Sequence, residues 1–344
     1  MTFDLIIVGF GRVARRFVAL LDEQRERLAR DHDIAVRVVE TITRRPDSVA
    51  AVRRSVRTHA AAARQRRLVV VEATTLDIER GEPATAHVRA ALAGGAHVMT
   101  VNKGPVAFAY RSLQRAAARA DRQFRFEGTV MDGVPVFNAA AELLPAVTIT
   151  GFRGVVNSTT NYILTAMEHG EPFAAALAAM QRNGIAEADA SLDVDGWDAA
   201  AKTAALANVL LGATITPHDV EREGVSGAAA ETIRLARATG RRVKLVASAR
   251  GRGNRVHARV GLLELAETDL LAGLDGPQNA IVLETDLIGD LAIVELGSGL
   301  TQTAYALFAD LVSIARAVSG RRRATPRSRR RVPRGGTRSG RGRR

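Results

Sequence analysis

The start of the chain carries the pattern that most narrows its fold. Residues 5–10, LIIVGF, form a short apolar run closed by glycine, and residues 12–31 then place apolar side chains at helical spacing with charge on the opposite face. The pattern predicts a strand, a tight turn and a helix. A chain that begins this way is expected to open with an α/β domain.

Three further β-rich runs continue the same rhythm. They span residues 34–43, 67–74 and 96–102, and helix-like segments such as TAHVRAALAGG separate them. Alternation of this kind indicates a parallel sheet with right-handed crossovers. We expect this domain to occupy residues 1–125.

The turn after the first strand has the spacing of a phosphate-binding loop. Gly9 allows the tight turn, Gly11 lets the backbone approach a pyrophosphate, and Ala14 allows close packing of helix on strand. A helix N-terminus offers free N–H groups and a positive dipole to such an anion. A glycine-rich turn without a ligand is the alternative. The predicted dinucleotide contacts here are Gly9, Phe10, Gly11, Arg12 and Val13.

The end of the second strand bears on the choice between NAD and NADP. That strand leads into Arg44 and Arg45, and arginine at this position accommodates the additional phosphate of NADP. Glu40 lies inside the strand, too early to reach the ribose. NADP is therefore predicted, with a solvated charged loop as the alternative.

The rhythm changes after residue 125, and a second domain of α+β type is expected over residues 126–300. Residues 123–137 suggest strand and loop, residues 148–157 a strand, and residues 161–170 and 171–184 two helices, each ending at a glycine. Residues 301–319 have the apolar face of a helix that returns to the first domain. The fold class predicted is thus α/β, a dinucleotide-binding domain followed by an α+β domain.

Charge is concentrated at the end of the chain. The net charge is +13, but residues 320–344 hold 12 arginines and no acid, so the rest is nearly neutral. This tail has almost no apolar residues and is expected to be disordered. It offers salt-sensitive contacts to a polyanion such as nucleic acid, although it has no aromatic residue for base stacking. A solvated extension without function is the simpler alternative.

Cysteine and long apolar segments are both missing from the sequence. Without cysteine there can be no disulfides and no thiolate catalysis. No run of 18 or more apolar residues suggests a membrane span. A cytoplasmic protein without membrane partners is expected.

Lysine is rare and therefore informative. Of 49 basic residues only Lys103, Lys202 and Lys244 are lysines, and an ammonium can lose its proton where a guanidinium cannot. If residues 196–212 form a helix, Asp198 and Lys202 lie at i and i+4 on one face. An ordinary exposed ion pair is the alternative. Glu187 and Asp193 precede this helix and can face the same point.

A second lysine follows the fourth predicted strand. Open α/β sheets bind ligands at the carboxyl ends of their strands, so Lys103 is expected to touch the cofactor or the substrate. A loop lysine before a proline-started helix is the alternative. Thr74, Asn102 and Lys103 are the predicted cofactor contacts at this edge.

Taken in order, several stretches together resemble homoserine dehydrogenases over residues 4–318. They are GFGRVA, TVNKGP, FEGTVMDGVPV, NSTTNYILTAM, GIAEADASLDVDGWDAAAKTAALA and GSGLTQTAYALFADL. The resemblance implies a Rossmann domain and an α+β domain for substrate binding and dimerisation. It also implies NAD(P)-dependent interconversion of aspartate 4-semialdehyde and homoserine, in threonine and methionine synthesis.

The resemblance also assigns roles. Lys202 corresponds to the proton donor and acceptor, and Asp198 and Lys103 join it as the catalytic set. Gly299 corresponds to a further cofactor contact. The implied substrate contacts are Glu187, Asp193, Asn157 and Thr159. A monovalent cation, Na⁺ or K⁺, would take Glu127 and the carbonyls of Val130, Asp132 and Val134, which are hard oxygen ligands.

Three features depart from the family pattern. Ser158 replaces a glycine in the usual Asn-Gly-Thr, and the late glycine cluster is thinned to residues 295–299, ELGSG. No kinase or regulatory domain is recognised, so feedback by threonine through such a domain is not expected. A paralogue that binds the dinucleotide with impaired catalysis is therefore kept as an alternative to an active enzyme.

Overall fold

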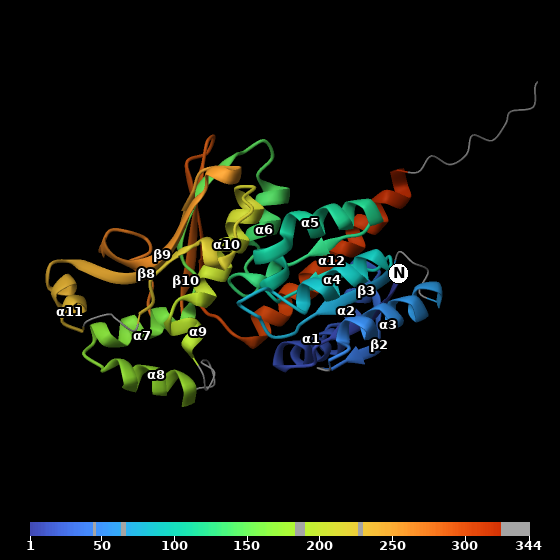
Figure 1. Cartoon of the computed structure of the whole chain (residues 1–344), viewed down its shortest axis with the longest axis horizontal. Helices are drawn as coiled ribbons and strands as arrows, with labels where there is room; N and C mark the ends of the chain where they lie inside the picture. The colour runs from blue at the N-terminus through green and yellow to red at the C-terminus, as the bar shows by residue number, and fades with distance from the viewer. Residues whose placement is uncertain (44–45, 63–66, 183–189, 226–229, 325–344) are drawn as a thin grey trace, which may run out of the picture.

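The computed structural model describes residues 1–43, 46–62, 67–182, 190–225 and 230–324. Two sheets lie side by side along the long axis of the molecule, and helix α10 (Trp197–Leu210) lies between them (Figure 1). The C-terminal helix α12 (Leu300–Ala324) crosses back to the first domain (Figure 1). Within the described ranges, no helix is both long and apolar enough to cross a membrane.

The first sheet is wholly parallel, as predicted, and it has five strands where the sequence predicted four. Its order is β2-β1-β3-β4-β5. The strands are β1 (Thr2–Val8), β2 (Ala35–Ile42), β3 (Leu68–Glu72), β4 (His97–Thr100) and β5 (Phe124–Arg125). The inner strands β1 and β3, and β4, are buried on both faces, which explains their nearly continuous apolar runs, whereas the edge strand β2 is largely exposed.

Alternate residues of β1 face opposite layers of helices. Leu5 and Ile7 belong to a buried cluster with α1 (Arg12–Glu23) and α12. Ile6 and Val8 belong to a second cluster with α3 (Ser48–Ala62), α4 (Ala84–Ala93) and α5 (Gly104–Ala120). The single helix expected over 12–31 is instead two, α1 and α2 (Arg25–His32), because Gln24 leaves the helical conformation.

The second sheet is six-stranded, in the order β11-β10-β6-β8-β9-β7, and antiparallel except for β7 beside β9. Its strands are β6 (Ile149–Val155), β7 (Glu221–Arg222), β8 (Arg241–Arg250), β9 (His257–Ala266), β10 (Asn279–Thr285) and β11 (Asp290–Glu295). The larger helices with it are α7 (Ser158–Glu168), α8 (Phe173–Arg182), α10 and α11 (Ala230–Ala238). Short elements are η2 (Glu127–Thr129), α6 (Val136–Asn138), η3 (Ala139–Leu143), α9 (Ser191–Val194), η4 (Pro217–Asp219) and η5 (Gly253–Arg255).

Two helices hold the domains together. Helix α10 is rich in buried alanines, whose small side chains let it pack closely on α5, and Asn208 donates from α10 to the carbonyls of Val106 and Ala107. Helix α12 packs on α1, where Arg16 donates to Thr301. It continues past residue 319, the expected boundary of the tail, to Ala324. The rest of the tail lies outside the described residues.

Candidate active site

The glycine turn after β1 has the shape that a pyrophosphate requires. Gly9 has φ +84°, and a Cβ there would lie 2.6 Å from the carbonyl oxygen of Ala73. Gly11 is the N-cap of α1 and has no side chain to cap it, and among the described residues nothing lies within 4 Å of a Cβ placed on it. A helix start without a side-chain cap from its N-cap residue suits the phosphates of a dinucleotide.

The neighbouring predicted contacts line the same turn. The guanidinium carbon of Arg15 lies over the ring of Phe10, 5.8 Å from the centre of that ring. Arg12 and Val13 form the first turn of α1, where Arg12 is exposed.

Arg44 and Arg45, the predicted NADP contacts, lie outside the described residues. Glu40 accepts hydrogen bonds from Ser55 at 2.6 Å and His59 at 3.2 Å, so its carboxylate is engaged by α3.

At the carboxyl ends of β3 and β4, Asn102 ties two loops together. Its amide nitrogen donates to the carbonyls of Thr74 (3.0 Å) and Thr75 (3.1 Å), and its amide oxygen accepts from the backbone N–H of Gly104 at 2.8 Å. The buried carboxylate of Glu72 accepts from the hydroxyls of Thr74 and Thr100. This set makes the edge of the sheet rigid and directs the next residue, Lys103, toward the second domain.

Asp198 connects the two domains through a double ion pair. One carboxylate oxygen lies 3.0 Å from Lys103 Nζ at the start of α5, and the other lies 3.0 Å from Lys202 Nζ one turn along α10. The three side chains are only 15–21% exposed. The sequence predicted the i,i+4 pair, and the structure adds the lysine of the other domain to it.

The turn between β6 and α7 completes this cluster. Lys202 donates to the carbonyl of Val156 at 2.6 Å. Asn157 donates to Asp193 at 2.7 Å and to Asp198 at 2.9 Å, while its own oxygen caps α7 by accepting from Thr160. Asn157 thus holds two carboxylates close together at the position where α10 begins.

The charges set the protonation states within the cluster. Burial acts to lower the pKa of Lys202, but the attraction of Asp198, aided by Asp132 and Asp193, leaves that pKa raised. For Asp198, burial is outweighed by Lys103 and Lys202, which hold its pKa well below the usual range. Burial and the charge of Asp198 raise the pKa of Asp193. Lys202 is therefore held as an ammonium and Asp198 as a carboxylate.

The remaining predicted substrate and cofactor contacts fall into three groups. Thr159 is buried in the first turn of α7. Gly299 precedes α12, and its backbone N–H donates to Asp132 at 3.0 Å. Asp132 also accepts from Thr303 at 2.9 Å, so it anchors the start of α12. Glu187 lies outside the described residues.

The predicted cation loop is folded around a buried glutamate. Both carboxylate oxygens of Glu127 accept backbone N–H groups, from Phe137 at 2.7 Å and Asn138 at 2.8 Å. Burial raises the pKa of Glu127 to about 7. Nearby, Asp310 accepts from the N–H of Glu127 through one oxygen, and its other oxygen is buried without a hydrogen bond from any described residue.

The other predicted ligands follow in the same loop. Val130 is buried just after η2, and Asp132 has a positive φ. The carbonyl of Val134 accepts from the N–H of Val136 at 2.9 Å. Among the described residues, no group of three or more histidine, cysteine or acidic side chains could hold a metal ion. The oxygen donors suit a hard monovalent cation, which needs only carbonyls and one carboxylate.

Three contributors to the site carry no signal in the sequence. The Val156 carbonyl belongs to the backbone, Asn279 lies outside the motifs, and Glu295 opens the late glycine cluster ELGSG, where no role was assigned to it. Asn279 donates both to Ser158 and to Glu295. A search for lysines and acids at fixed spacing overlooks such groups, because only folding brings Val156 to Lys202, 46 positions away, and Asn279 to Ser158, 121 positions away.

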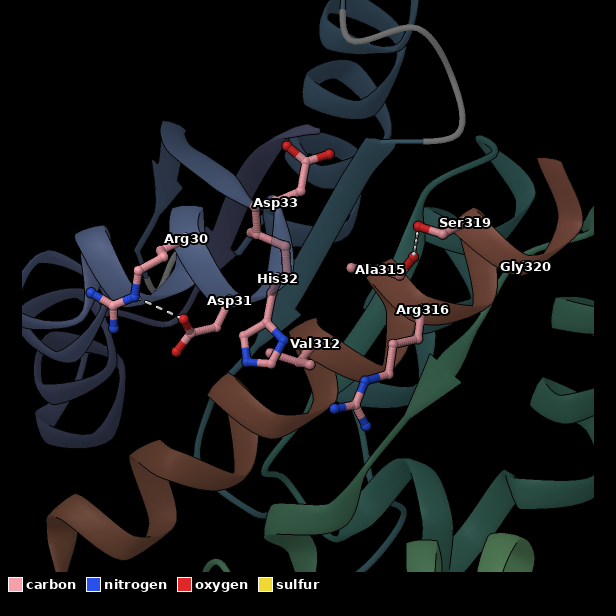
Figure 2. A pocket seen from close by; sticks show the side chains of 10 residues that line it. Arg30, Asp31, His32, Asp33, Val312, Ala315, Arg316, Ser319 and Gly320 are labelled. Atoms are coloured by element: carbon pink, nitrogen blue, oxygen red, sulfur yellow. Dashed lines mark hydrogen bonds and ion pairs between the residues drawn. The ribbon is translucent and has the colours of Figure 1, made fainter. Parts of the chain in front are cut away.

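A hollow of about 640 Å³ lies elsewhere, between the end of α2 and α12 (Figure 2). In Figure 2 the imidazole of His32 points toward Val312, and Arg30 pairs with Asp31. This hollow adjoins the start of β2, at the amino ends of the parallel strands, whereas α/β sheets bind ligands at the opposite edge. It contains none of the predicted site residues.

Comparison with known proteins points to one family. Residues 135–312 match the family model for homoserine dehydrogenase, and residues 9–127 match the model for the homoserine dehydrogenase NAD binding domain. The NAD(+)-dependent homoserine dehydrogenase of Pseudomonas canavaninivorans is 39% identical over 247 residues, which are 72% of this chain and 70% of that protein. The homoserine dehydrogenase of Sulfurisphaera tokodaii is 31% identical over 91% of this chain and 98% of its own length.

Solved structures lead to the same group. A crystal structure of a homoserine dehydrogenase from Thiobacillus denitrificans superposes with a TM-score of 0.80 at 30% identity, covering 93% of this chain and 74% of that one. The similarity therefore spans both sheets and the interface between them.

Proposed function

This chain belongs to the homoserine dehydrogenase family and is an NAD(P)-dependent oxidoreductase, and from that premise we propose how its residues carry the reaction. Lys202 exchanges the proton of the substrate oxygen, with Asp198 and Lys103 completing the catalytic set. The double ion pair of Asp198, 3.0 Å to each lysine, is the observation that carries this proposal.

The nicotinamide, when bound, takes up or supplies the hydride at the carbonyl carbon. Reduction of the semialdehyde also requires a proton on the oxygen that becomes the hydroxyl. Lys202 is suited to donate it because its neighbours raise its pKa and keep it protonated. Lys103, from the first domain, lies on the cofactor side of Asp198 and positions that carboxylate.

In the direction of oxidation, Lys202 must accept the proton and therefore must first be neutral. Carboxylates oppose this unless they have another cation to bind. The ammonium group of homoserine is that cation: Asp193 and Asp198, held by Asn157, receive it together with Glu187. Thr159 is assigned to the same substrate pocket. Binding of the substrate thus weakens the hold of Asp198 on Lys202 at the moment when a base is needed.

We assign NADP as the preferred cofactor through Arg44 and Arg45, and a phosphate site at Gly9, Gly11 and the start of α1. The Pseudomonas relative is named as NAD(+)-dependent, so both cofactors belong in the assay. Replacing both arginines with alanine should raise the KM for NADP about 10-fold or more and leave that for NAD nearly unchanged. Equal changes for both cofactors would refute this assignment.

We assign a monovalent cation to Glu127 and the carbonyls of Val130, Asp132 and Val134. A cation there would offset the burial of Glu127 and Asp310, two neighbouring carboxylates. Adding K⁺ or Na⁺ at constant ionic strength, against tetramethylammonium, should raise the melting temperature. The Glu127→Gln variant should lose that increase.

We further infer a homodimer formed through the second sheet, where the β10–β11 hairpin exposes several large apolar side chains. These are Leu287, Ile288, Val294 and Leu296. Such a cluster is typical of a contact surface. Light scattering of the purified chain tests it, and a monomer at micromolar concentration would exclude it.

The central test is kinetic. NADPH formation from homoserine is followed, with serine and threonine as control substrates, for wild type and for Lys202→Ala. The variant should lose about 100-fold or more in turnover while its affinity for NADP stays the same. Unchanged turnover would refute the role of Lys202. An impaired paralogue is disfavoured by the intact cluster of Lys103, Asp198 and Lys202, and an inactive wild type would restore that alternative.

A further inference from the structure

The turn between β6 and α7 is a point where three consecutive residues bind partners from different parts of the fold. The Val156 carbonyl accepts from Lys202, the Asn157 amide donates to Asp193 and Asp198, and the Ser158 hydroxyl accepts from Asn279 at 2.8 Å. Val156 and Asn157 thus contact the group formed by Lys103, Asp193, Asp198 and Lys202, called the catalytic cluster below. Ser158 connects the same turn to the edge of the second sheet.

Asn279 makes this connection with both of its amide hydrogens. It is the first residue of β10 and lies opposite Glu295, the last residue of β11. Its nitrogen donates to Ser158 and also to a carboxylate oxygen of Glu295 at 2.9 Å. Asn279 is 2% and Glu295 6% exposed, so water does not readily replace these bonds.

Glu295 is also within electrostatic range of the catalytic cluster. Burial raises its pKa to about 7, the Asn279 hydrogen bond opposes this, and the charges of Asp132 and Lys202 act in opposite directions on it. Asp132 in turn anchors α12 through Gly299 and Thr303. The end of β11, the start of α12 and the turn before α7 therefore meet beside Lys202.

Ser158 gives the turn an anchor that a glycine lacks. The family motif that this stretch resembles has glycine at the position, which offers no side-chain oxygen and allows more backbone conformations. Here the hydroxyl is bound by a buried amide that a carboxyl group holds in place. A backbone restrained on both sides keeps the Val156 carbonyl and the Asn157 amide in one arrangement.

We propose that Ser158, Asn279 and Glu295 act together as positioning residues for the reaction: through the turn at residues 156–158 they set the geometry of Lys202 and Asp198. None of the three is assigned a contact with the reacting atoms. The inference rests on the proposed role of Lys202, because positioning is detected through the proton transfer that Lys202 performs.

Asn279→Ala is the direct test, because it removes both hydrogen bonds. The variant should lose about 10-fold in kcat with homoserine, and its KM for NADP should stay within about twofold of wild type, since the glycine turn is remote. A change in Tm without this kinetic pattern would mean a structural role only, and the inference would be wrong.

Glu295 offers a matched pair of variants. Glu295→Gln keeps an acceptor oxygen for Asn279 and should retain most of the turnover, whereas Glu295→Ala removes it and should approach the loss seen in Asn279→Ala. Equal loss in both would indicate that the charge of Glu295 matters rather than its hydrogen bond, which contradicts positioning through Asn279.

Ser158→Ala provides a milder variant should Asn279→Ala fail to fold. It removes one acceptor on the helix surface, and a loss of about threefold in kcat is expected. In the double variant with Asn279→Ala the losses should not multiply, because the hydroxyl no longer has its donor. Fully multiplicative losses would overturn the proposal.

The Lys202→Ala variant separates the positioning role from the proposed function on which it rests. If it is inactive and the Asn279 and Ser158 variants match wild type in kcat, the positioning role fails and the proposed function stands. If Lys202→Ala retains full turnover, the proposed function itself fails.

Discussion

Two lysines of the second domain, both largely enclosed, have pKa values shifted in opposite directions. Lys202 lies between Asp198 and the Val156 carbonyl, next to the other domain. Lys244, on β8, is fully buried and donates to the Asn161 amide oxygen at 3.0 Å and the Leu274 carbonyl at 2.6 Å. The pKa of Lys202 is raised, whereas burial and then the charge of Arg242 lower the pKa of Lys244 to about 8.

The difference shows that neighbours, and not burial alone, decide the charge state of a lysine. Lys202 has a carboxylate at 3.0 Å that offsets its desolvation. Lys244 has neutral oxygens as its direct partners, and the carboxylates of Glu168 and Asp275 are engaged by Arg242. Lys202 therefore keeps its proton and, in the proposed function, exchanges it with the substrate oxygen, whereas Lys244 ties β8 to α7 and the 274–278 loop.

The largest expected effect comes from removing the carboxylate of Asp198, which lies beside Lys202 and has no counterpart in direct contact with Lys244. Asp198→Asn leaves Lys103 and Lys202 facing each other without a carboxylate, which lowers the pKa of Lys202 and releases its position. Turnover with homoserine should fall about 100-fold or more. The control is Asp195→Asn, a nearby acid to which no role is assigned. A similar loss in both variants would mean that the effect is not specific to Asp198.

The next effect concerns stability and should leave catalysis intact. Lys244→Ala leaves a cavity and two buried acceptors without a donor, so the free energy of unfolding should fall by about 2–3 kcal/mol. Urea unfolding measures this, and kcat per folded molecule should match wild type. Lys244→Met, which conserves volume, should lose less. Impaired kcat in both variants would place Lys244 in the catalytic machinery and remove the contrast with Lys202.

The smallest effect is a dependence on pH that only Lys244 should produce. Its pKa in the folded protein, about 8, lies below the ordinary 10.5, so the unfolded chain binds more protons between these values. The free energy of unfolding should therefore increase by up to about 2.5 kcal/mol, relative to Lys244→Met, as pH rises from about 8 to about 10.5. Lys202, with its raised pKa, acts in the opposite sense and only above 10.5. If the difference in free energy of unfolding between wild type and Lys244→Met does not change with pH, the pKa of Lys244 is not lowered.

Most of the first domain followed from local patterns. The glycine turn at Gly9 and Gly11, the four parallel strands that precede β5 and helix α4 lie where periodicity predicted them. The break at Gln24 was not foreseen, because the helical pattern of residues 12–31 continues through it. The order of the strands in the second sheet could not be predicted either, since pairing between distant strands leaves little trace in a local pattern.

The candidate site was likewise predictable only in part. The sequence alone predicted a glycine turn before α1 and placed Asp198 and Lys202 on one face of a helix, the residues to which the proposed chemistry is assigned. Only the tertiary structure decided that Lys103 reaches Asp198 from the other domain, that a backbone carbonyl binds Lys202, and that Asn279 joins Ser158 to Glu295. The physical reason is the separation along the chain. A helix sets the spacing of residues four apart, whereas the contacts of Lys202 with Val156 (46 positions apart) and of Ser158 with Asn279 (121 positions apart) depend on how α10, α5 and the second sheet pack.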